Sequence, residues 1–433
     1  MSVSEMVSRP AFDDVVLQRR IMRLRQADNV TNLYYLAREY ACLAATVGVA
    51  VAFGESRAGW GLSWYWNVPV FATAIVVIGA LQHRLAGLGH ESSHYTFLKN
   101  RFCNDLIPDL FCMFPIMTSV HFYRVFHMAH HQYTNDPERD PDLLNLGRGK
   151  RAFEFPMTRK RFIAVVYFCM IVAPLRFAEY QFAYMVVNTL GKGRSIYRRR
   201  DGADHGRFEV YIPRLATALG VVYAFALSAF FGWLHLTDRP GWIVPSGLAA
   251  GAVATLILRG LPDWAVFQSP FRQVYSTRFA AAARLWFFTT ALMALAILRY
   301  QTGGASALYV ILLWFAPILT TFPFFMLLRD VYQHSNADTG RLTNSRVFFA
   351  DPLTRWAVFV YGQDMHIPHH LFPAIPHYRL AELHQILKES HHDYSEQVVE
   401  CHGTFKGDES HPTILDEMTR PRPRFGMNGP ATS

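Results

Sequence analysis

The chain has 433 residues, of which 51% are hydrophobic and only 17% charged, a balance that favours a membrane protein over a set of soluble domains. The formal net charge is +9, yet the basic residues cluster beside apolar segments, at residues 19–25, 159–161 and 198–200, which argues against nucleic acid as a partner. Five cysteines lie far apart without a C-x-x-C pair, so the sequence indicates neither a disulfide framework nor a thiolate metal site.

The N-terminal part of the chain predicts a membrane hairpin that follows a polar leader. Residues 1–33 are polar and basic and show no apolar face long enough to pack, so we expect a cytoplasmic leader. Apolar runs follow at about residues 40–54 and 68–88, and the Trp-rich stretch WGLSWYW between them suits a turn at the far membrane surface. Two crossings return the chain to the leader's side, where HESSH at residues 90–94 emerges.

The remaining elements predict an all-α integral membrane protein. Short apolar stretches at residues 105–117 and 162–175 favour interfacial helices. Runs at about residues 214–236, 243–258, 285–298 and 306–328 favour two further hairpins, unless two of the four are interfacial. The expected fold has four to six transmembrane helices, interfacial helices and a cytoplasmic helical cap. Residues 34–400 would form this membrane-embedded domain and residues 401–433 a disordered tail, with both termini cytoplasmic.

Three short segments concentrate histidine: HESSH, HMAHH and HIPHH. A single histidine near a membrane interface is most often a surface residue, but two H-x-x-H-H pentads and a third pair expected on the same side are poorly explained that way. Residues three and four apart share a helix face, so each segment can direct its imidazoles at one centre. In HIPHH, Pro368 requires the helix to begin nearby, and Pro373 should end it. The histidines of these segments are His90, His94, His127, His130, His131, His366, His369 and His370.

Eight imidazoles exceed what one tetrahedral ion takes, so they predict two metal ions. An all-nitrogen set suits Fe, Zn, Cu or Ni rather than Mg or Ca. His334, in QHSNAD after the last apolar run, is a ninth candidate. Carboxylates beside these segments suit a role in orienting the imidazoles, although each could equally cap a helix. They are Glu91, Asp136, Asp140, Asp142, Asp338 and Asp364.

Two metal ions bound by nitrogen at the cytoplasmic end of apolar spans would suit a site that an apolar chain enters and where one of its C–H bonds is oxidised. That chemistry requires a redox metal, because zinc has no accessible second oxidation state. The sequence therefore favours iron at both positions.

The segments HESSH, HMAHHQYTNDPERDPD, QHSNAD and HIPHHLFPAIPHYRL, in this order, resemble the three-histidine-box membrane fatty-acid desaturase and hydroxylase superfamily. The likeness covers roughly residues 35–390 and is strongest to the acyl-lipid desaturases in HHLFPAIPHYRL. It implies two non-haem iron ions held by the eight box histidines, with O2 as co-substrate and a lipid or acyl substrate. His334 matches an additional ligand, and Asn336 matches an alternative in which an asparagine holds a water.

The resemblance also implies an electron donor and a location. The chain has no HPGG haem motif and no cluster-type cysteine spacing, so we expect a separate ferredoxin, or a b-type cytochrome with its reductase. The expected location is the bacterial inner membrane or the endoplasmic reticulum, with the active site facing the cytoplasm.

Several functions remain open at this stage. The favoured one is introduction of a double bond into a fatty acyl chain, and the alternative is a hydroxylase, ketolase or monooxygenase on the same scaffold. A membrane metal transporter should place its ligands at mid-membrane depth, and a zinc hydrolase needs only three ligands and a general base. Both describe this sequence less well.

Overall fold

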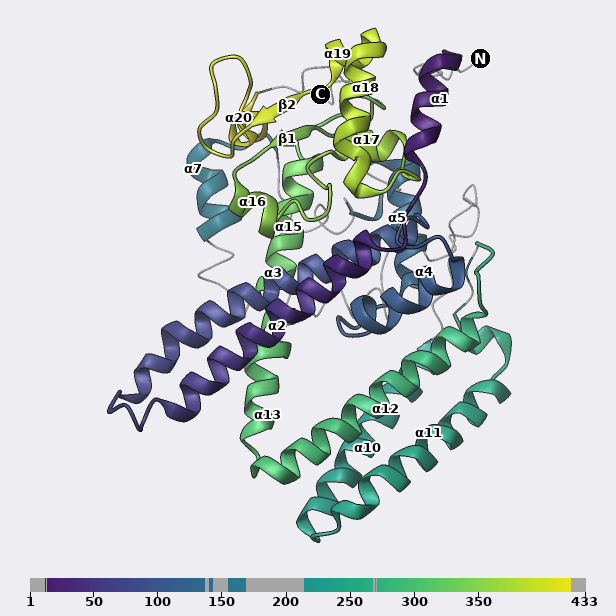
Figure 1. The fold of residues 1–433 in the computed structure, drawn as a ribbon, viewed down its shortest axis with the longest axis vertical. Coiled ribbons are helices and arrows are strands. Elements are labelled where there is room, and N and C mark those ends of the chain that lie inside the picture. The colour runs from purple at the N-terminus through teal and green to yellow at the C-terminus, as the bar shows by residue number, and fades with distance from the viewer. Residues whose placement is uncertain are drawn as a thin grey trace, which may run out of the picture.

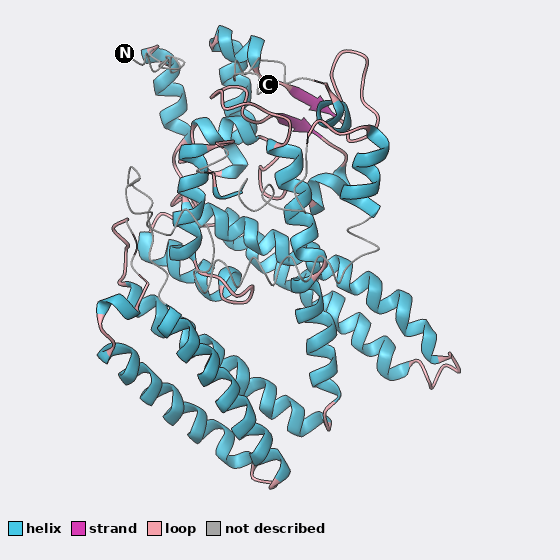
Figure 2. Ribbon diagram, turned by 180° about the vertical axis from the view of Figure 1, so that it is seen from behind, coloured by secondary structure: helices cyan, strands magenta, loops and turns pink. Residues whose placement is uncertain are grey.

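The structure, a computed structural model, describes residues 12, 14–136, 140–142, 155–168, 214–267, 269 and 271–421. In these ranges the chain is almost wholly helical. Long helices extend from one side of the molecule, and a cap of short helices with one pair of strands lies on the other (Figure 1). Figure 2 shows the same division from behind.

Within the described residues, six helical segments are long and apolar enough to cross a membrane. They are Thr31–Ser56, Trp64–Ser93, Leu215–Leu236, Pro240–Gly260, Thr277–Thr302 and Ala305–His334. All six apolar runs found in the sequence therefore lie in helices that could span a membrane, which is the upper limit of the prediction. Their outward faces carry large exposed apolar side chains, such as Phe225 at 74% and Leu256 at 68% exposure, which is expected for surfaces that contact lipid.

The spans form three groups (Figure 1). Helices α2 (Thr31–Ser56) and α3 (Asn67–Ser93) make a hairpin whose turn contains the short helix η1 (Trp64–Trp66) and exposes several aromatic rings. Helices α10 (Arg214–Leu236), α11 (Ile243–Gly260) and α12 (Thr277–Thr302) pack around a small core of their own. The last span contains α13 (Ala305–Val310), the π-helical turn η6 (Ile311–Phe315), α14 (Ala316–Leu319) and α15 (Thr321–His334).

Helices α3 and α15 touch closely because Gly79 has no side chain. A Cβ atom at Gly79 would lie 2.0 Å from Thr321 Oγ1 and 2.7 Å from the backbone nitrogen of Phe322. Thr321 Oγ1 uses this approach to donate a hydrogen bond to the carbonyl of Ile75, at 2.8 Å. The contact fixes the two helices that end at the histidine-rich cap.

The cap and the interfacial region contain short elements. Between α3 and α10 these are α4 (Arg101–Pro108), the π-helical turn η2 (Asp109–Met113), α5 (Val120–Tyr133), α7 (Arg159–Phe162) and the π-helical turn η3 (Ile163–Phe168). Short 3-10 turns flank α11: η4 (Pro240–Trp242) and η5 (Asp263–Ala265). After α15 come β1 (Val347–Phe349), α16 (Pro352–Ala357), α17 (His366–Leu371), η7 (His377–Arg379), α18 (Leu380–Ser390), α19 (His392–Gln397), β2 (Glu400–His402) and α20 (Ile414–Thr419). Strands β1 and β2 pair in parallel, with Phe348 opposite Cys401. The second interfacial stretch is described only to residue 168, and its remainder lies outside the described residues.

The structure corrects the predicted ends of the domain. Residues 15–24, expected to have no packing face, form α1 (Val15–Leu24), and Leu17, Ile21 and Leu24 at spacings of four and three bury one stripe against α18. Residues 401–421, expected to be disordered, contribute part of β2 and the whole of α20. A capping box at Thr413 begins α20, and its apolar side chains pack against α15. The rest of the predicted tail, residues 422–433, lies outside the described residues.

Candidate metal centre

Nine histidines from four segments meet where α3 and α15 enter the cap. His90 lies in the last turn of α3 and His94 is its C-terminal cap, while His334 is the final residue of α15. The cap helices α5 and α17 supply the other six: His127, His130, His131, His366, His369 and His370. Helix α17 begins at His366 and ends at Leu371, as Pro368 and Pro373 predicted.

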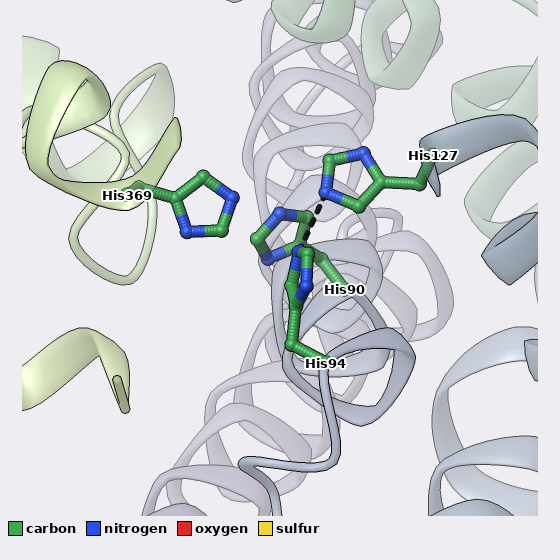
Figure 3. A group of neighbouring side chains, drawn as sticks. All are labelled: His90, His94, His127 and His369. Carbon is green, nitrogen blue, oxygen red and sulfur yellow. Dashed lines mark hydrogen bonds between the residues drawn. The ribbon is translucent and has the colours of Figure 1, made fainter. Parts of the chain in front are cut away.

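The first cluster, group A, contains His90, His94, His127 and His369, and one ring nitrogen of each lies within 4.8 Å of the others. Figure 3 shows the four rings converging from α3, α5 and α17. The Nε2 atoms of His94 and His127 are 2.8 Å apart. His131 lies at the edge of the group, with its Nε2 2.9 Å from that of His127 and 3.1 Å from that of His369.

The second cluster, group B, contains His130, His334, His366 and His370, again with ring nitrogens within 4.8 Å of one another. His366 Nε2 is 2.8 Å from His334 Nε2 and 3.0 Å from His370 Nε2. The ring of His131 stacks on that of His370, with centroids 4.4 Å apart. His131 therefore lies between the two groups.

Each H-x-x-H-H pentad is divided between the groups. On α5, His127 and His131 face group A and His130 faces group B, whereas on α17, His366 and His370 face group B and His369 faces group A. In both pentads positions i and i+4 point to one side and position i+3 to the other. Two helices thereby contribute imidazoles to both groups.

Hydrogen bonds on the Nδ1 side orient the rings of group B. His130 Nδ1 lies 3.0 Å from Asp140 Oδ1 and 3.4 Å from an Asp142 carboxylate oxygen. His334 Nδ1 lies 3.1 Å from the carbonyl oxygen of Asn344, which can only accept, so this nitrogen is the protonated one. The Nε2 atom of His334 is then left with a free lone pair facing His366, as metal ligation requires.

Burial keeps most of these imidazoles neutral. It holds the pKa of His94, His127 and His369 well below the usual value, and the neighbouring histidines lower it further. Burial also opposes protonation of His130, but the carboxylates of Asp140 and Asp142 outweigh it and raise the pKa of this histidine to about 9. The neutral rings are suited to bind a cation, and His130 is held by a carboxylate as a metal-bound histidine commonly is.

The carboxylates singled out in the sequence have different surroundings. Asp140 and Asp142 contact His130 as described, and Glu91 Oε1 lies 3.4 Å from His90 Nδ1. For Asp136 the structure shows backbone bonds, in which its amide donates to the carbonyl of Tyr133 and its carbonyl accepts from the amide of Asp140.

The other two carboxylates of that set, together with Asn336, bond elsewhere. Asp364 pairs with Arg355 at 2.9 Å, and the carboxylate of Asp338 accepts hydrogen bonds from the backbone amide of Gly340 and the hydroxyl of Thr343. The side-chain amide of Asn336 donates to carbonyl oxygens at the end of α20. The side-chain bonds of these three residues therefore lie outside the two histidine groups.

Sequence reasoning missed several polar residues around the groups. Gln363 Nε2 lies 3.3 Å from a ring nitrogen of His90, and Thr134 Oγ1 lies 3.2 Å from His370 Nδ1. His377, which lies outside the three histidine segments, is buried, and its backbone amide donates to the side chain of Glu91. Gln363 precedes the third box by three residues, and Thr134 follows the second box by three, so proximity to the boxes was the available signal.

The donor set fits a pair of metal ions. One proton can be shared in a hydrogen bond between only two nitrogens, but four ring nitrogens converge in each group. A metal cation bound between them would accept all four lone pairs. Imidazole suits iron, copper, nickel or zinc, and the described residues that face the groups include no thiolate.

Comparison with known proteins gives consistent matches. The family model described as Fatty acid desaturase matches residues 63–265 and 252–403. Over 231 residues the chain is 29% identical to dihydrorhizobitoxine desaturase of Bradyrhizobium elkanii, covering 53% of this chain and 58% of that protein. It is 30% identical over 115 residues to Delta(12) fatty acid desaturase fat-2 of Caenorhabditis elegans, covering 26% and 27% of the two chains. It is 38% identical over 81 residues to sn-1 oleoyl-lipid 12-desaturase of Anabaena variabilis, covering 18% and 23%. The chain thus matches less than two thirds of the length of each of these relatives.

Proposed function

This chain belongs to the fatty acid desaturase family, and we propose that it introduces a double bond into the acyl chain of a membrane lipid. The observation that carries the proposal is the pair of buried four-histidine groups at the end of apolar spans. We assign the ligand roles to all nine histidines, with His131 shared at the boundary. The polar residues that orient them are Asp140, Asp142 and Glu91.

Two iron ions bound in these groups would supply the O2-dependent chemistry that removes hydrogen from an unactivated C–H bond. The chain's own residues provide the setting. Neutral imidazoles offer Nε2 lone pairs, Asp140 holds the ring of His130, and burial excludes bulk water from both groups. The apolar spans allow an acyl chain to approach from the bilayer.

In the proposed reaction each of two adjacent carbons loses one hydrogen. O2 accepts these, together with two electrons and two protons from outside, and leaves as two water molecules. The electrons require a separate donor, and we propose a ferredoxin, or a b-type cytochrome with its reductase. Purified chain with iron, O2 and substrate should then turn over at most once, and adding the donor system should restore cycling. Sustained turnover driven by NAD(P)H and the isolated chain alone would contradict a separate donor.

For orientation we propose that both histidine groups and the cap face the cytoplasm, in the bacterial inner membrane or the endoplasmic reticulum. The support is the basic residues of α1 beside the cap and the even number of candidate spans among the residues that the structure describes. Single cysteines placed at Ser63, in the α2–α3 turn, and at Ser390, at the end of α18, should label from opposite sides of the membrane in a background without native thiols. If Ser390→Cys were labelled from the outer face of the membrane, the cap would face outward, opposite to the proposed orientation.

The product experiment compares lipids and small metabolites from a host that expresses the wild-type chain, His130→Ala, or His392→Ala. The side chain of His392 is 80% exposed and outside both groups, so this variant is the matched control. We expect a new double bond, seen by mass spectrometry as a loss of two hydrogens, in the wild type and the control but not in His130→Ala.

Small metabolites are included because one of the longer matches is to a dihydrorhizobitoxine desaturase. An unsaturated product outside the lipid fraction would show that the substrate is a small metabolite and not a lipid. A hydroxylated product would show that the enzyme inserts oxygen and does not form a double bond. Equal products in all three strains would refute the proposal.

A further inference from the structure

A second cluster of possible metal ligands lies in the C-terminal part of the cap, apart from groups A and B. Glu400 and His402 are the ends of β2, and His411 lies beyond the loop of residues 403–410 that leads to α20 (Figure 1). One ligand atom from each of the three residues lies within 4.8 Å of the others. The two imidazole rings stack face to face, with centroids 3.8 Å apart and planes 7° from parallel.

The Nδ1 atoms of both rings are held by one carboxylate. Asp408 Oδ2 lies 2.9 Å from His402 Nδ1, and Asp408 Oδ1 lies 2.8 Å from His411 Nδ1. A carboxylate on this side fixes the proton at Nδ1 and leaves the lone pair at Nε2. Both stacked rings therefore present Nε2 atoms in the same direction.

Those Nε2 atoms face the free oxygen of Glu400. Glu400 Oε2 lies 4.0 Å from Nε2 of each histidine, while Glu400 Oε1 is bound by Lys388 at 2.6 Å and His384 at 3.2 Å. In the described part of the chain, His402 Nε2 is shielded from water and has no hydrogen-bond partner. A shielded lone pair without a partner is costly unless a ligand occupies the space in front of it.

We propose that Glu400, His402 and His411 bind one zinc ion, with Asp408 orienting the two histidines. Ligand atoms around a tetrahedral zinc lie about 3.4 Å apart, given bonds of about 2.1 Å, so the 4.0 Å distances must shorten. Because the two rings are nearly parallel, they must also tilt out of their stack on binding, so that both in-plane Nε2 lone pairs point at one ion. Two neutral imidazoles and one carboxylate suit zinc and do not suit calcium or magnesium. The three ligands leave a fourth position for water on this partly exposed surface.

The bound ion would fasten the loop of residues 403–410 to β2. Gly403, with φ of +72°, begins this loop, and its amide donates to the carbonyl of Phe349 on β1. Beyond the loop, α20 packs into the core that includes Tyr332 of α15. The ion would therefore stabilise the segment of residues 403–419, whose helix α20 packs against α15, without contacting groups A or B.

Metal counting on the full-length chain tests the site. Iron-loaded protein in detergent is equilibrated with zinc, freed of unbound metal, and assayed for both metals by mass spectrometry. The variant is His411→Asn, because the asparagine side-chain nitrogen can keep the hydrogen bond to Asp408 while the Nε2 ligand is lost. We expect one zinc fewer per chain than in the wild type, unchanged iron and an unchanged elution volume. The matched control His392→Ala should retain the wild-type zinc count.

Two further measurements address affinity and location. Asp408→Asn should bind the ion about 10- to 100-fold more weakly, because only the orientation of the rings is lost. Zinc should slow amide hydrogen exchange in residues 400–415 of the wild type and leave it unchanged in His411→Asn. Equal zinc counts in the wild type and His411→Asn, or no zinc beyond that displaced from iron sites, would overturn the proposal and leave a hydrogen-bonded histidine pair.

Discussion

The Nδ1 atom of His130 lies 3.0 Å from Asp140 Oδ1, and this contact begins a chain of hydrogen bonds that reaches His334. Asp140 Oδ2 accepts from the amide of Asn135 at 2.7 Å, and the side chain of Asn135 donates to the carbonyl of Asn344 at 2.9 Å. The same carbonyl faces His334 Nδ1 at 3.1 Å. Two proposed ligands of group B, from α5 and α15, are thus oriented by one connected network.

Asp140→Asn should lower the metal affinity of the proposed site in group B without abolishing binding. The substitution preserves shape but removes the charge that holds the proton on His130, and changes of this kind typically cost about 10- to 100-fold in metal affinity or activity. Iron content after dialysis against increasing chelator, together with turnover, measures the effect. Asp364→Asn is the comparison, because Asp364 pairs with the largely exposed Arg355 and should keep wild-type iron. Equal iron loss in both variants would contradict a specific role of Asp140 in orienting His130.

His334→Ala and Asn336→Ala separate two explanations for the region after the last span. His334 Nε2 lies 2.8 Å from His366 Nε2, so its loss should reduce bound iron by one ion per chain and abolish activity. The side chain of Asn336 donates to the carbonyls of Glu417 and Arg420. Its replacement should therefore leave both irons bound and loosen α20, measured as faster proteolysis of the C-terminal segment. Loss of iron in Asn336→Ala with retention in His334→Ala would favour an asparagine-held water.

The spans and the histidine segments could be predicted because each has a signal in the local sequence. Apolar runs of sufficient length indicate membrane helices, and repeated imidazoles at helical spacing indicate a candidate metal centre. The division of each pentad between two groups could not be predicted, because it depends on how α5 and α17 are rotated about their axes. That rotation is set by packing between distant segments.

The ends of the domain were missed for a similar reason. Leu17, Ile21 and Leu24 form a stripe of only three apolar residues, which is too weak a signal unless the groove beside α18 is known. Asp140 and Asp364 look equivalent in the sequence, since each lies near a histidine box. Tertiary contacts distinguish them, because one turns toward His130 and the other toward Arg355.

Gly79→Ala should destabilise the protein by separating α3 from α15. The added Cβ would lie 2.7 Å from the backbone nitrogen of Phe322, which cannot move without shifting α15, and overpacking of this kind costs about 1–3 kcal/mol. We expect a lower thermal inactivation midpoint and reduced iron retention, since the two helices carry proposed ligands at their ends. The matched control is Gly48→Ala on α2, where a Cβ meets nothing within 4 Å. A midpoint unchanged in Gly79→Ala would show that the helices adjust freely.

Asp109→Asn should make the protein more stable at pH 8 than the wild type. Burial raises the pKa of Asp109 to about 6, although the amide of Val120 and the hydroxyl of Tyr275 donate to its carboxylate at 2.6 and 2.7 Å. The unfolded-state pKa is about 3.9, so between about pH 4 and 6 the folded protein binds the extra proton, and wild-type stability falls as pH rises through this window. Asparagine does not titrate, its Oδ1 can accept from the Val120 amide, and its Nδ2 can donate to the Tyr275 hydroxyl in place of the bond that the carboxylate accepts.

The advantage of Asp109→Asn over the wild type should grow by about 1 kcal/mol from pH 5 to pH 8, which unfolding midpoints of both proteins at each pH would measure. Asp105→Asn, four residues earlier in the chain, should change the stability at pH 8 in the opposite direction. Burial opposes ionisation of Asp105, but His121 and Arg124 outweigh it and lower the pKa, so its charged form stabilises the fold above the unfolded pKa and that stability is lost as pH falls. Asp105→Asn should therefore be the less stable protein at pH 8. If Asp109→Asn were less stable than the wild type at pH 8, its carboxylate would be stabilised in the folded chain and the assignment of a raised pKa would be wrong.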